Sequence, residues 1–193
     1  CSIDESMARF EPVVQGAKAA GLRVRGAISC AVGCPYQGDV SPDEVERVVK
    51  AYRALGVDQV SMADTIGVGT PRQVQAALER VLRHYPLHEV CGHYHDTYGQ
   101  ALANVLVSLQ MGVRVFDTSV AGLGGCPFAV GATGNVATED VAYLLRGMDI
   151  DTGVDFDALV DAGQFISEKL GRANGSRAAR GWLAQRARRQ AQA

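Results

Sequence analysis

The chain has 193 residues, of which 47% are apolar and 21% charged, with a formal net charge of -2. This composition is typical of a soluble globular domain and excludes a disordered, fibrous or membrane-embedded protein. No apolar run reaches the roughly 18 residues of a membrane-spanning helix, and the first residues carry acids where a secretion signal carries bases, so we expect a cytoplasmic protein.

Cysteine usage and charge placement support this expectation. The five cysteines are odd in number, which argues against a disulfide framework, so the thiols are expected to be reduced. Lys169 to Arg189 carries seven bases and no acid. No aromatic residues alternate with these bases as they would in a nucleic-acid binder, so residues 172–193 are predicted to form a basic tail, helical or frayed, that binds neither nucleic acid nor a membrane.

Apolar, β-rich runs alternate with stretches of helical spacing along the chain. A helix is predicted over Asp4–Ala20, and further helices begin at Ser41-Pro42, at Thr70-Pro71 and near Tyr98. The predicted strands are Leu22–Cys30, Val57–Met62, Glu89–His95 and Val113–Val120. This alternation predicts parallel βαβ units, which occur in barrels and in doubly wound sheets.

The position of the polar residues favours the barrel. Reactive side chains stand at the carboxyl ends of the strands, where (β/α)₈ TIM barrels build their active sites, at Cys30, Asp64, His93 to Asp96 and Ser119. A doubly wound sheet would usually show a phosphate-binding loop, and none of the right form is present. A complete barrel needs about 250 residues and eight strands. We therefore expect residues 1–171 to form roughly the last four βα units of a barrel with C-terminal helices. The N-terminal half of the barrel would be a partner that this sequence lacks.

The motif His93-Tyr94-His95-Asp96 is the strongest chemical signal in the residues themselves. Residues i and i+2 of a strand point to the same face, so both imidazoles can reach one ion while Tyr94 points away. A pair of histidines is often structural. As metal ligands they would need oxygen partners, for which Asp64 and Asn135 are candidates.

Two further segments carry candidate functional groups. Asp64 ends an apolar run and could equally be a turn or capping aspartate. The loop Ala121–Ala129 places Cys126 among glycines, which suits a mobile segment that brings a thiol to a substrate, although a buried cysteine is usually inert. Thr138 can cap the helix that follows, which leaves Asn135 without a structural explanation.

Several of these segments together resemble the hydroxymethylglutaryl-CoA lyase family. The similarity extends from Cys1 to about Gly171 and is carried by long blocks: HYHDTYGQALAN (His93–Asn104), SVAGLGGCPFA (Ser119–Ala129), GNVATED (Gly134–Asp140), ADTIGVGTP (Ala63–Pro71) and SCAVGCPYQG (Ser29–Gly38). The resemblance implies a TIM-barrel lyase that cleaves 3-hydroxy-3-methylglutaryl-CoA to acetyl-CoA and acetoacetate with Mg²⁺ or Mn²⁺.

The family pattern also implies a role for each matching residue. His93, His95 and Asn135 would be metal ligands, with His93 also catalytic; Cys126 would be the loop thiol, Asp64 an acid or base, and Glu139 a residue near the reaction. An acyl-CoA would be the substrate, and relatives form homodimers.

Three departures from the family pattern matter. The family's first-strand aspartate and arginine are not in this chain, Tyr94 replaces the usual Cys, and Gly171-Arg172-Ala173 replaces a polar stretch that helps to hold CoA. Two alternatives therefore stay open. One is a related aldolase or acyl-CoA condensing synthase with the same metal face, and the other is an inactive half-barrel.

Overall fold

A computed structural model of the chain describes residues 2–125 and 134–192. The first part contains α1 (Ile3–Ala19), β1 (Arg25–Ile28), α2 (Pro42–Leu55), β2 (Gln59–Asp64), α3 (Pro71–Val81), the 3₁₀ turn η1 (Leu87–Glu89), β3 (Val90–Tyr94) and α4 (Ala101–Gln110). The first part also contains β4 (Val115–Asp117) and the 3₁₀ turn η2 (Val120–Gly122), and the second part contains α5 (Thr138–Gly147), α6 (Phe156–Lys169) and α7 (Arg177–Gln190).

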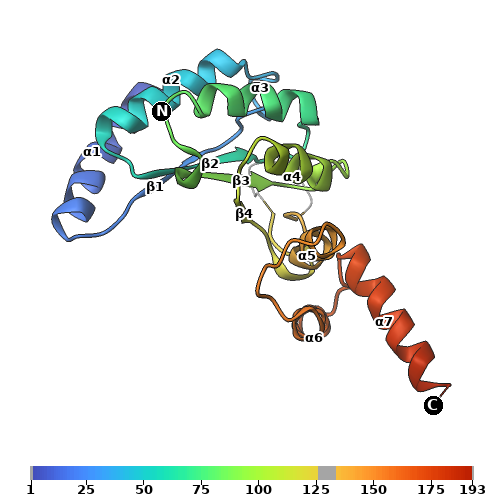
Figure 1. The fold of residues 1–193 in the computed structure, drawn as a ribbon. Helices are drawn as coiled ribbons and strands as arrows, with labels where there is room; N and C mark the ends of the chain where they lie inside the picture. Colours follow the sequence, from blue (N-terminus) through green and yellow to red (C-terminus); the bar gives the residue numbers. More distant parts are fainter. Residues whose placement is uncertain (1, 126–133, 193) are drawn as a thin grey trace.

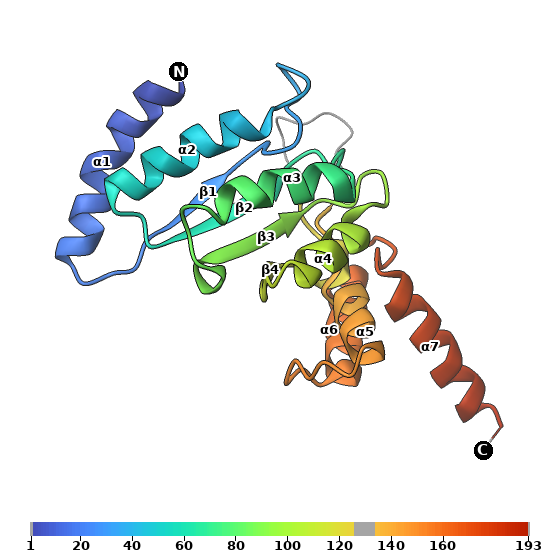
Figure 2. The ribbon, with the colours of Figure 1, turned by 45° about the horizontal axis from the view of Figure 1, so that its top comes forward.

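The four strands form one parallel sheet in the order of the sequence, β1-β2-β3-β4. A helix follows each of the first three strands, and α1 to α4 pack side by side in chain order along the sheet (Figures 1 and 2). Successive βα units that each add a parallel strand beside the previous one are the repeating unit of a barrel wall. The predicted βαβ order and all four predicted strands are confirmed.

The sheet is curved, as a barrel wall must be. Arg25 on β1 and Asp117 on β4 form an ion pair of 2.9 Å although two strands separate them. Neighbouring strands lie roughly 4.8 Å apart, so on a flat sheet the two side chains would have to span about 14 Å. Their contact therefore indicates that the face carrying both residues is concave.

Local sequence signals explain where the helices begin and end. Ser41 caps α2 with a capping box to Glu44, and Gly56 closes it in the left-handed conformation at φ 82°. The helix buries Val45 and Val49 against the sheet. The helix expected from about Tyr98 begins only at Ala101, because the Asp96 carboxylate accepts the Ala101 backbone N–H (3.0 Å) and the residues between form a turn.

The basic C-terminal segment includes a helix that packs on the rest of the chain. Ser176 caps α7, Ala179 is fully buried, and the Trp182 ring meets Phe156 edge-on at 5.1 Å. The indole N–H of Trp182 donates to Asp157 (2.7 Å). Helix α7 thus packs against α5 and α6, and its Arg186 pairs with Asp157 of α6 (3.5 Å). Among the described residues, no helix is long and apolar enough to cross a membrane.

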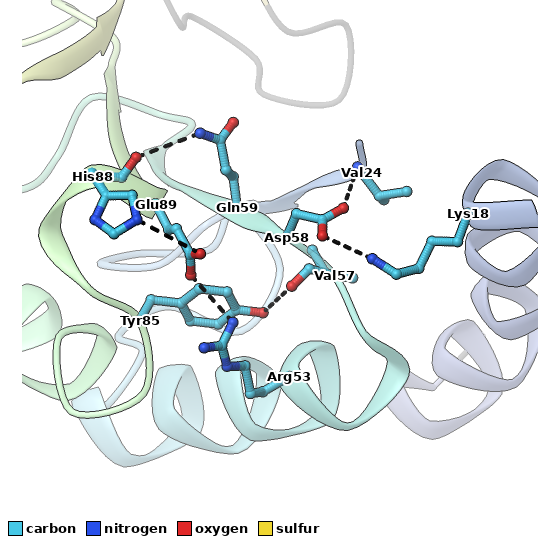
Figure 3. Close-up of polar contacts among 9 residues, drawn as sticks. All are labelled: Lys18, Val24, Arg53, Val57, Asp58, Gln59, Tyr85, His88 and Glu89. Carbon is cyan, nitrogen blue, oxygen red and sulfur yellow. Dashed lines mark hydrogen bonds and ion pairs between the residues drawn. The ribbon is translucent and has the colours of Figure 1, made fainter. Parts of the chain in front are cut away.

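A polar network joins the layers at the amino ends of the strands (Figure 3). Asp58 accepts from Lys18 of α1 (2.8 Å) and from the backbone N–H of Val24 (2.8 Å). Arg53 of α2 pairs with Glu89 (3.2 Å) and lies over the Tyr85 ring. This end of a barrel serves stability, because active sites form at the opposite end.

Acid is expected to weaken the fold partly through Asp58. The Lys18 ammonium and the Val24 N–H lower the pKa of this carboxyl in the folded chain. Its contribution to stability is therefore complete above the unfolded-state pKa and is lost as pH falls through the folded-state pKa. Asp58→Asn should lower the melting temperature at neutral pH and reduce its further fall on acidification to pH 3. Asp43→Asn, at an exposed site, is the matched control; equal acid sensitivity of Asp58→Asn and the unaltered chain would contradict the assignment.

Candidate functional site

His93 and His95 face the concave side of the sheet together, as the strand alternation predicts. Their rings lie 5.5 Å apart between centroids and line the same pocket. Tyr94 points to the other side, where its hydroxyl hydrogen-bonds with Ser108 of α4 (2.7 Å). His95 is buried and His93 is half-buried.

The pocket, of about 470 Å³, is lined by residues from all four strands. Its polar residues include Arg25, Ser61, Thr65, His93, His95 and Asp117. Arg25, Ser61, His93 and Asp117 lie in the strands, whereas Thr65 and His95 directly follow β2 and β3. The two histidines therefore lie at the carboxyl end of β3. The site therefore stands where a barrel places its chemistry.

Asn135 joins the two histidines from a segment distant in the sequence. Its backbone pairs with His95 in an isolated antiparallel bridge, and its side-chain N–H₂ donates to the Leu123 carbonyl (3.1 Å). Among the described residues, the buried Asn135 Oδ1 has no hydrogen-bond partner. A buried amide oxygen without a partner costs free energy unless a ligand completes it.

These groups fit a divalent metal as a partial ligand set. Two imidazole nitrogens and one amide oxygen are donors that Mg²⁺ or Mn²⁺ accepts, provided that further oxygens come from water, substrate or protein. Within residues 2–125 and 134–192, no group of three or more His, Cys, Asp or Glu side chains is arranged to hold an ion. The described part of the chain thus offers no carboxylate to complete the set.

Asp117 lies beside His93 and is held by neighbouring strands. Its carboxylate accepts from Arg25 (2.9 Å) and from the Ser61 hydroxyl (3.1 Å), and its Oδ2 is 3.5 Å from Nδ1 of His93. Burial alone would raise the pKa of Asp117, but the hydrogen bonds and the charge of Arg25 outweigh it and lower the pKa. Asp117 is therefore an anion at neutral pH.

The structure does not bring Asp64 into this pocket, contrary to its expected place as an acid or base. Its side chain is fully buried and accepts the backbone N–H groups of Val68 (3.1 Å) and Gly69 (2.8 Å). The carboxylate organises the loop after β2, which is the turn-aspartate alternative. Burial raises its pKa, against the opposing effect of these hydrogen bonds.

Glu139 also lies away from the pocket lining. Both carboxylate oxygens accept the backbone N–H of Ala121 (3.0 Å each), and the side chain is fully buried. Burial, followed by the charge of Asp140, raises its pKa against the backbone hydrogen bonds. Since Ala121 has a φ of 56°, a strained value for a residue with a Cβ, Glu139 fixes the turn before the glycine-rich loop. Glu139 thus stabilises the backbone next to the site without lining the pocket.

Cys126, the expected catalytic thiol, lies outside the described residues, although its neighbour Gly125 lines the pocket. Cys91 is buried, and burial raises its pKa to about 11. The predicted cap at Thr138 is wrong: Ala137 is the N-cap residue of α5, and the Thr138 hydroxyl pairs with that of Thr118 (2.9 Å).

A second, basic pocket of about 300 Å³ is lined in part by Asn135, whose backbone bridges to His95. Arg172, Arg177 and Arg180 contribute guanidinium groups, and Asp96 pairs with Arg177 at 3.4 Å. The sequence pattern predicted these arginines to lie in a basic tail. The signal that could have found them is Ser176, an N-cap residue that marks the start of α7 at Arg177.

Comparison with known proteins places the chain in a family. The sequence profile described as HMGL-like matches residues 1–166.

The chain belongs to the HMGL-like family.

Curated relatives in this family are lyases. A Pseudomonas aeruginosa protein named 3-hydroxy-3-isohexenylglutaryl-CoA/hydroxy-methylglutaryl-CoA lyase is 56% identical over 95% of this chain and 61% of its own length. The mitochondrial hydroxymethylglutaryl-CoA lyase of Bos taurus is 52% identical over 93% of the chain and 55% of its own length. The chain therefore spans about three-fifths of the length of the curated relatives that it matches.

Solved structures confirm the fold class. The crystal structure of hydroxymethylglutaryl-CoA lyase from Pseudomonas aeruginosa superposes with a TM-score of 0.91 at 56% identity, covering 96% of this chain and 62% of that one. The curved parallel sheet with its outer helices is thus the corresponding part of a TIM-barrel lyase fold.

Proposed function

We propose that this chain forms the greater part of an acyl-CoA lyase that cleaves 3-hydroxy-3-methylglutaryl-CoA to acetyl-CoA and acetoacetate. The observation that carries the proposal is that His93 and His95 share a pocket at the carboxyl end of β3, where the backbone of Asn135, whose buried Oδ1 has no partner among the described residues, bridges to His95. Family membership and the names of the relatives support the reaction.

The three ligand residues would hold Mg²⁺ or Mn²⁺. When bound, the ion would polarise the hydroxyl and carbonyl oxygens of the substrate and stabilise their developing negative charge. The protein's part is to orient the donors. The backbone bridge between His95 and Asn135 fixes both residues, and the hydrogen bond from the Asn135 side-chain N–H₂ to the Leu123 carbonyl fixes the orientation of the amide.

The bond changes require one proton to leave and one to arrive. Loss of the tertiary hydroxyl proton lets the C2–C3 bond break, its electron pair passing to the thioester side, so that acetoacetate forms with the enolate of acetyl-CoA. The carbon of that enolate then takes a proton from an acid in the pocket. We assign this acid to Cys126, on the family pattern and because its neighbour Gly125 lines the pocket. The base that takes the hydroxyl proton would lie on the side of the pocket where His93 stands.

The basic pocket suits the phosphates of CoA. Arginine binds phosphate through paired N–H donors, and Arg172, Arg177 and Arg180 surround a space that adjoins Asn135. These arginines would take over the contacts of the polar stretch that Gly171-Arg172-Ala173 replaces. The Pseudomonas aeruginosa relative is named for two acyl groups, so the longer isohexenyl substrate belongs in the same assay. A homodimer and a cytoplasmic location are part of the same proposal, although some relatives are mitochondrial.

Activity in a completed barrel tests the proposal. The chain would be fused behind the first strands of the Pseudomonas aeruginosa relative, which by the family pattern carry the arginine and aspartate. With Mn²⁺ or Mg²⁺ this fusion should release acetoacetate, whereas the 193-residue chain alone should not, because two imidazoles and an amide bring no negative charge to a hard dication. Condensation without cleavage would indicate a synthase instead. A well-folded fusion that binds metal but does neither would refute the proposal.

A further inference from the structure

We propose that Asp117 is a positioning residue for His93, holding the imidazole in the tautomer that presents Nε2 to a divalent metal. This inference rests on the proposed metal site and adds to it a residue and a mechanism. The contact that carries it is the approach of Asp117 Oδ2 to His93 Nδ1 at 3.5 Å, on the concave face of the sheet.

The chemistry of the contact selects one tautomer. An ionised carboxylate only accepts hydrogen bonds, so it favours the neutral imidazole that carries its proton on Nδ1. The lone pair is then on Nε2, the nitrogen that remains for a metal. A distance of 3.5 Å exceeds that of a full-strength hydrogen bond, and such contacts tighten when the site is loaded. Outer carboxylates of this kind orient metal-binding histidines in many proteins.

The carboxylate is fixed by the curvature of the sheet. Asp117 belongs to β4, His93 to β3, Ser61 to β2 and Arg25 to β1, and the three partners converge on it. Ser61 donates to Oδ2, the oxygen that faces His93, while Arg25 holds Oδ1. The two donors therefore set the position of the carboxylate and keep it ionised, which explains why a charged pair lies on the inner face of the strands.

The test begins with a readout that needs no metal. Asp117→Asn keeps the shape of the side chain, but its amide can donate to Nδ1 and so stabilise the Nε2–H form. In ¹⁵N-labelled 193-residue chain at pH 8.5, the His93 ring nitrogens, assigned by comparison with His93→Gln, should show Nδ1–H in the unaltered chain. They should show a mixture of tautomers or the Nε2–H form in Asp117→Asn.

The second readout is Mn²⁺ affinity, measured by calorimetry or electron paramagnetic resonance on the fused barrel described above. Asp117→Asn should weaken binding roughly 10- to 100-fold, the range seen for loss of an outer partner. Ser61→Ala, which removes one donor to Asp117 and preserves the charge, should shift both readouts in the same direction by a smaller factor, and it serves if Asp117→Asn does not fold. Asp43→Asn, at an exposed site on α2, should change neither.

Each other outcome overturns the inference in a recognisable way. Weaker Mn²⁺ binding with an unchanged His93 tautomer would make Asp117 a direct ligand or a remote charge. An unchanged tautomer and unchanged affinity would leave it a purely structural residue. If the unaltered fused barrel binds no Mn²⁺ at all, the proposed metal site fails first, whatever the tautomer of His93.

Discussion

Removal of either imidazole from the fused barrel is expected to abolish tight Mn²⁺ binding and lower kcat/KM by orders of magnitude. An outer partner of a metal ligand is worth roughly 10- to 100-fold in affinity, and a direct ligand more. Asn135, whose backbone bridges to His95, offers only a neutral amide oxygen as a further donor. The site therefore has little to compensate for a lost nitrogen.

The two histidines call for different substitutions. His95 is 5% exposed and packs in the interior, so His95→Ala would add a cavity to the loss of a ligand. His95→Gln keeps most of the volume and separates the two effects. His93 is more exposed, and His93→Ala tests its nitrogen directly.

His88→Ala is the matched control for these variants. Its ring is 78% exposed at the amino end of β3, remote from the pocket, and its loss should leave Mn²⁺ binding and turnover unchanged. Calorimetric titration with Mn²⁺ and a coupled acetoacetate assay give the two quantities. Retention of wild-type metal affinity in both His93→Ala and His95→Gln would refute the ligand assignment.

Local chemistry made most of the fold predictable from the sequence. The capping box at Ser41 and the glycine at Gly56 fix the ends of α2 through contacts within a few residues. The alternation of side-chain direction along β3 likewise predicted that His93 and His95 lie on one face, and both rings line the same pocket. A helix start differed from the prediction where a side chain outside the helix accepted a backbone N–H at its start, as the Asp96 carboxylate does at Ala101.

The candidate site was predictable only in part, because the packing of the chain decides which side chains face the pocket. Asp64 and Glu139 occupy the matching positions of the family pattern, yet both carboxylates bind backbone N–H groups behind the pocket. Period-two counting along β2 would have placed Asp64 opposite to Ser61 and Ala63. The contact of Asp117 with Arg25 depends on sheet curvature, which no local pattern encodes.

The loss of the Cys126 thiol is expected to remove most of the activity while metal affinity stays nearly unchanged. A thiol has a pKa of about 8.5, so it can deliver a proton near neutral pH, whereas the hydroxyl of serine is a far weaker acid. The proposal gives Cys126 a role on the substrate and none on the ion. Cys126→Ser in the fused barrel should thus lower kcat strongly and leave the Mn²⁺ dissociation constant within about twofold of wild type, a ratio well below the tenfold that corresponds to 1.4 kcal/mol.

Alkylation provides an independent measurement, provided that the other thiols are controlled. Cys91 should react slowly because its pKa is raised to about 11 by burial. Cys30 and Cys34 are both partly exposed, and Cys34 is the stronger competing target because backbone hydrogen bonds from Tyr36 and Gln37 lower its pKa. The experiment therefore starts from Cys34→Ser, which should be fully active. In that background a thiol reagent should inactivate the fused barrel, substrate should protect it, and mass spectrometry should find the label on Cys126. Full activity of Cys126→Ser, or inactivation with the label elsewhere, would show that the loop thiol takes no part in the reaction.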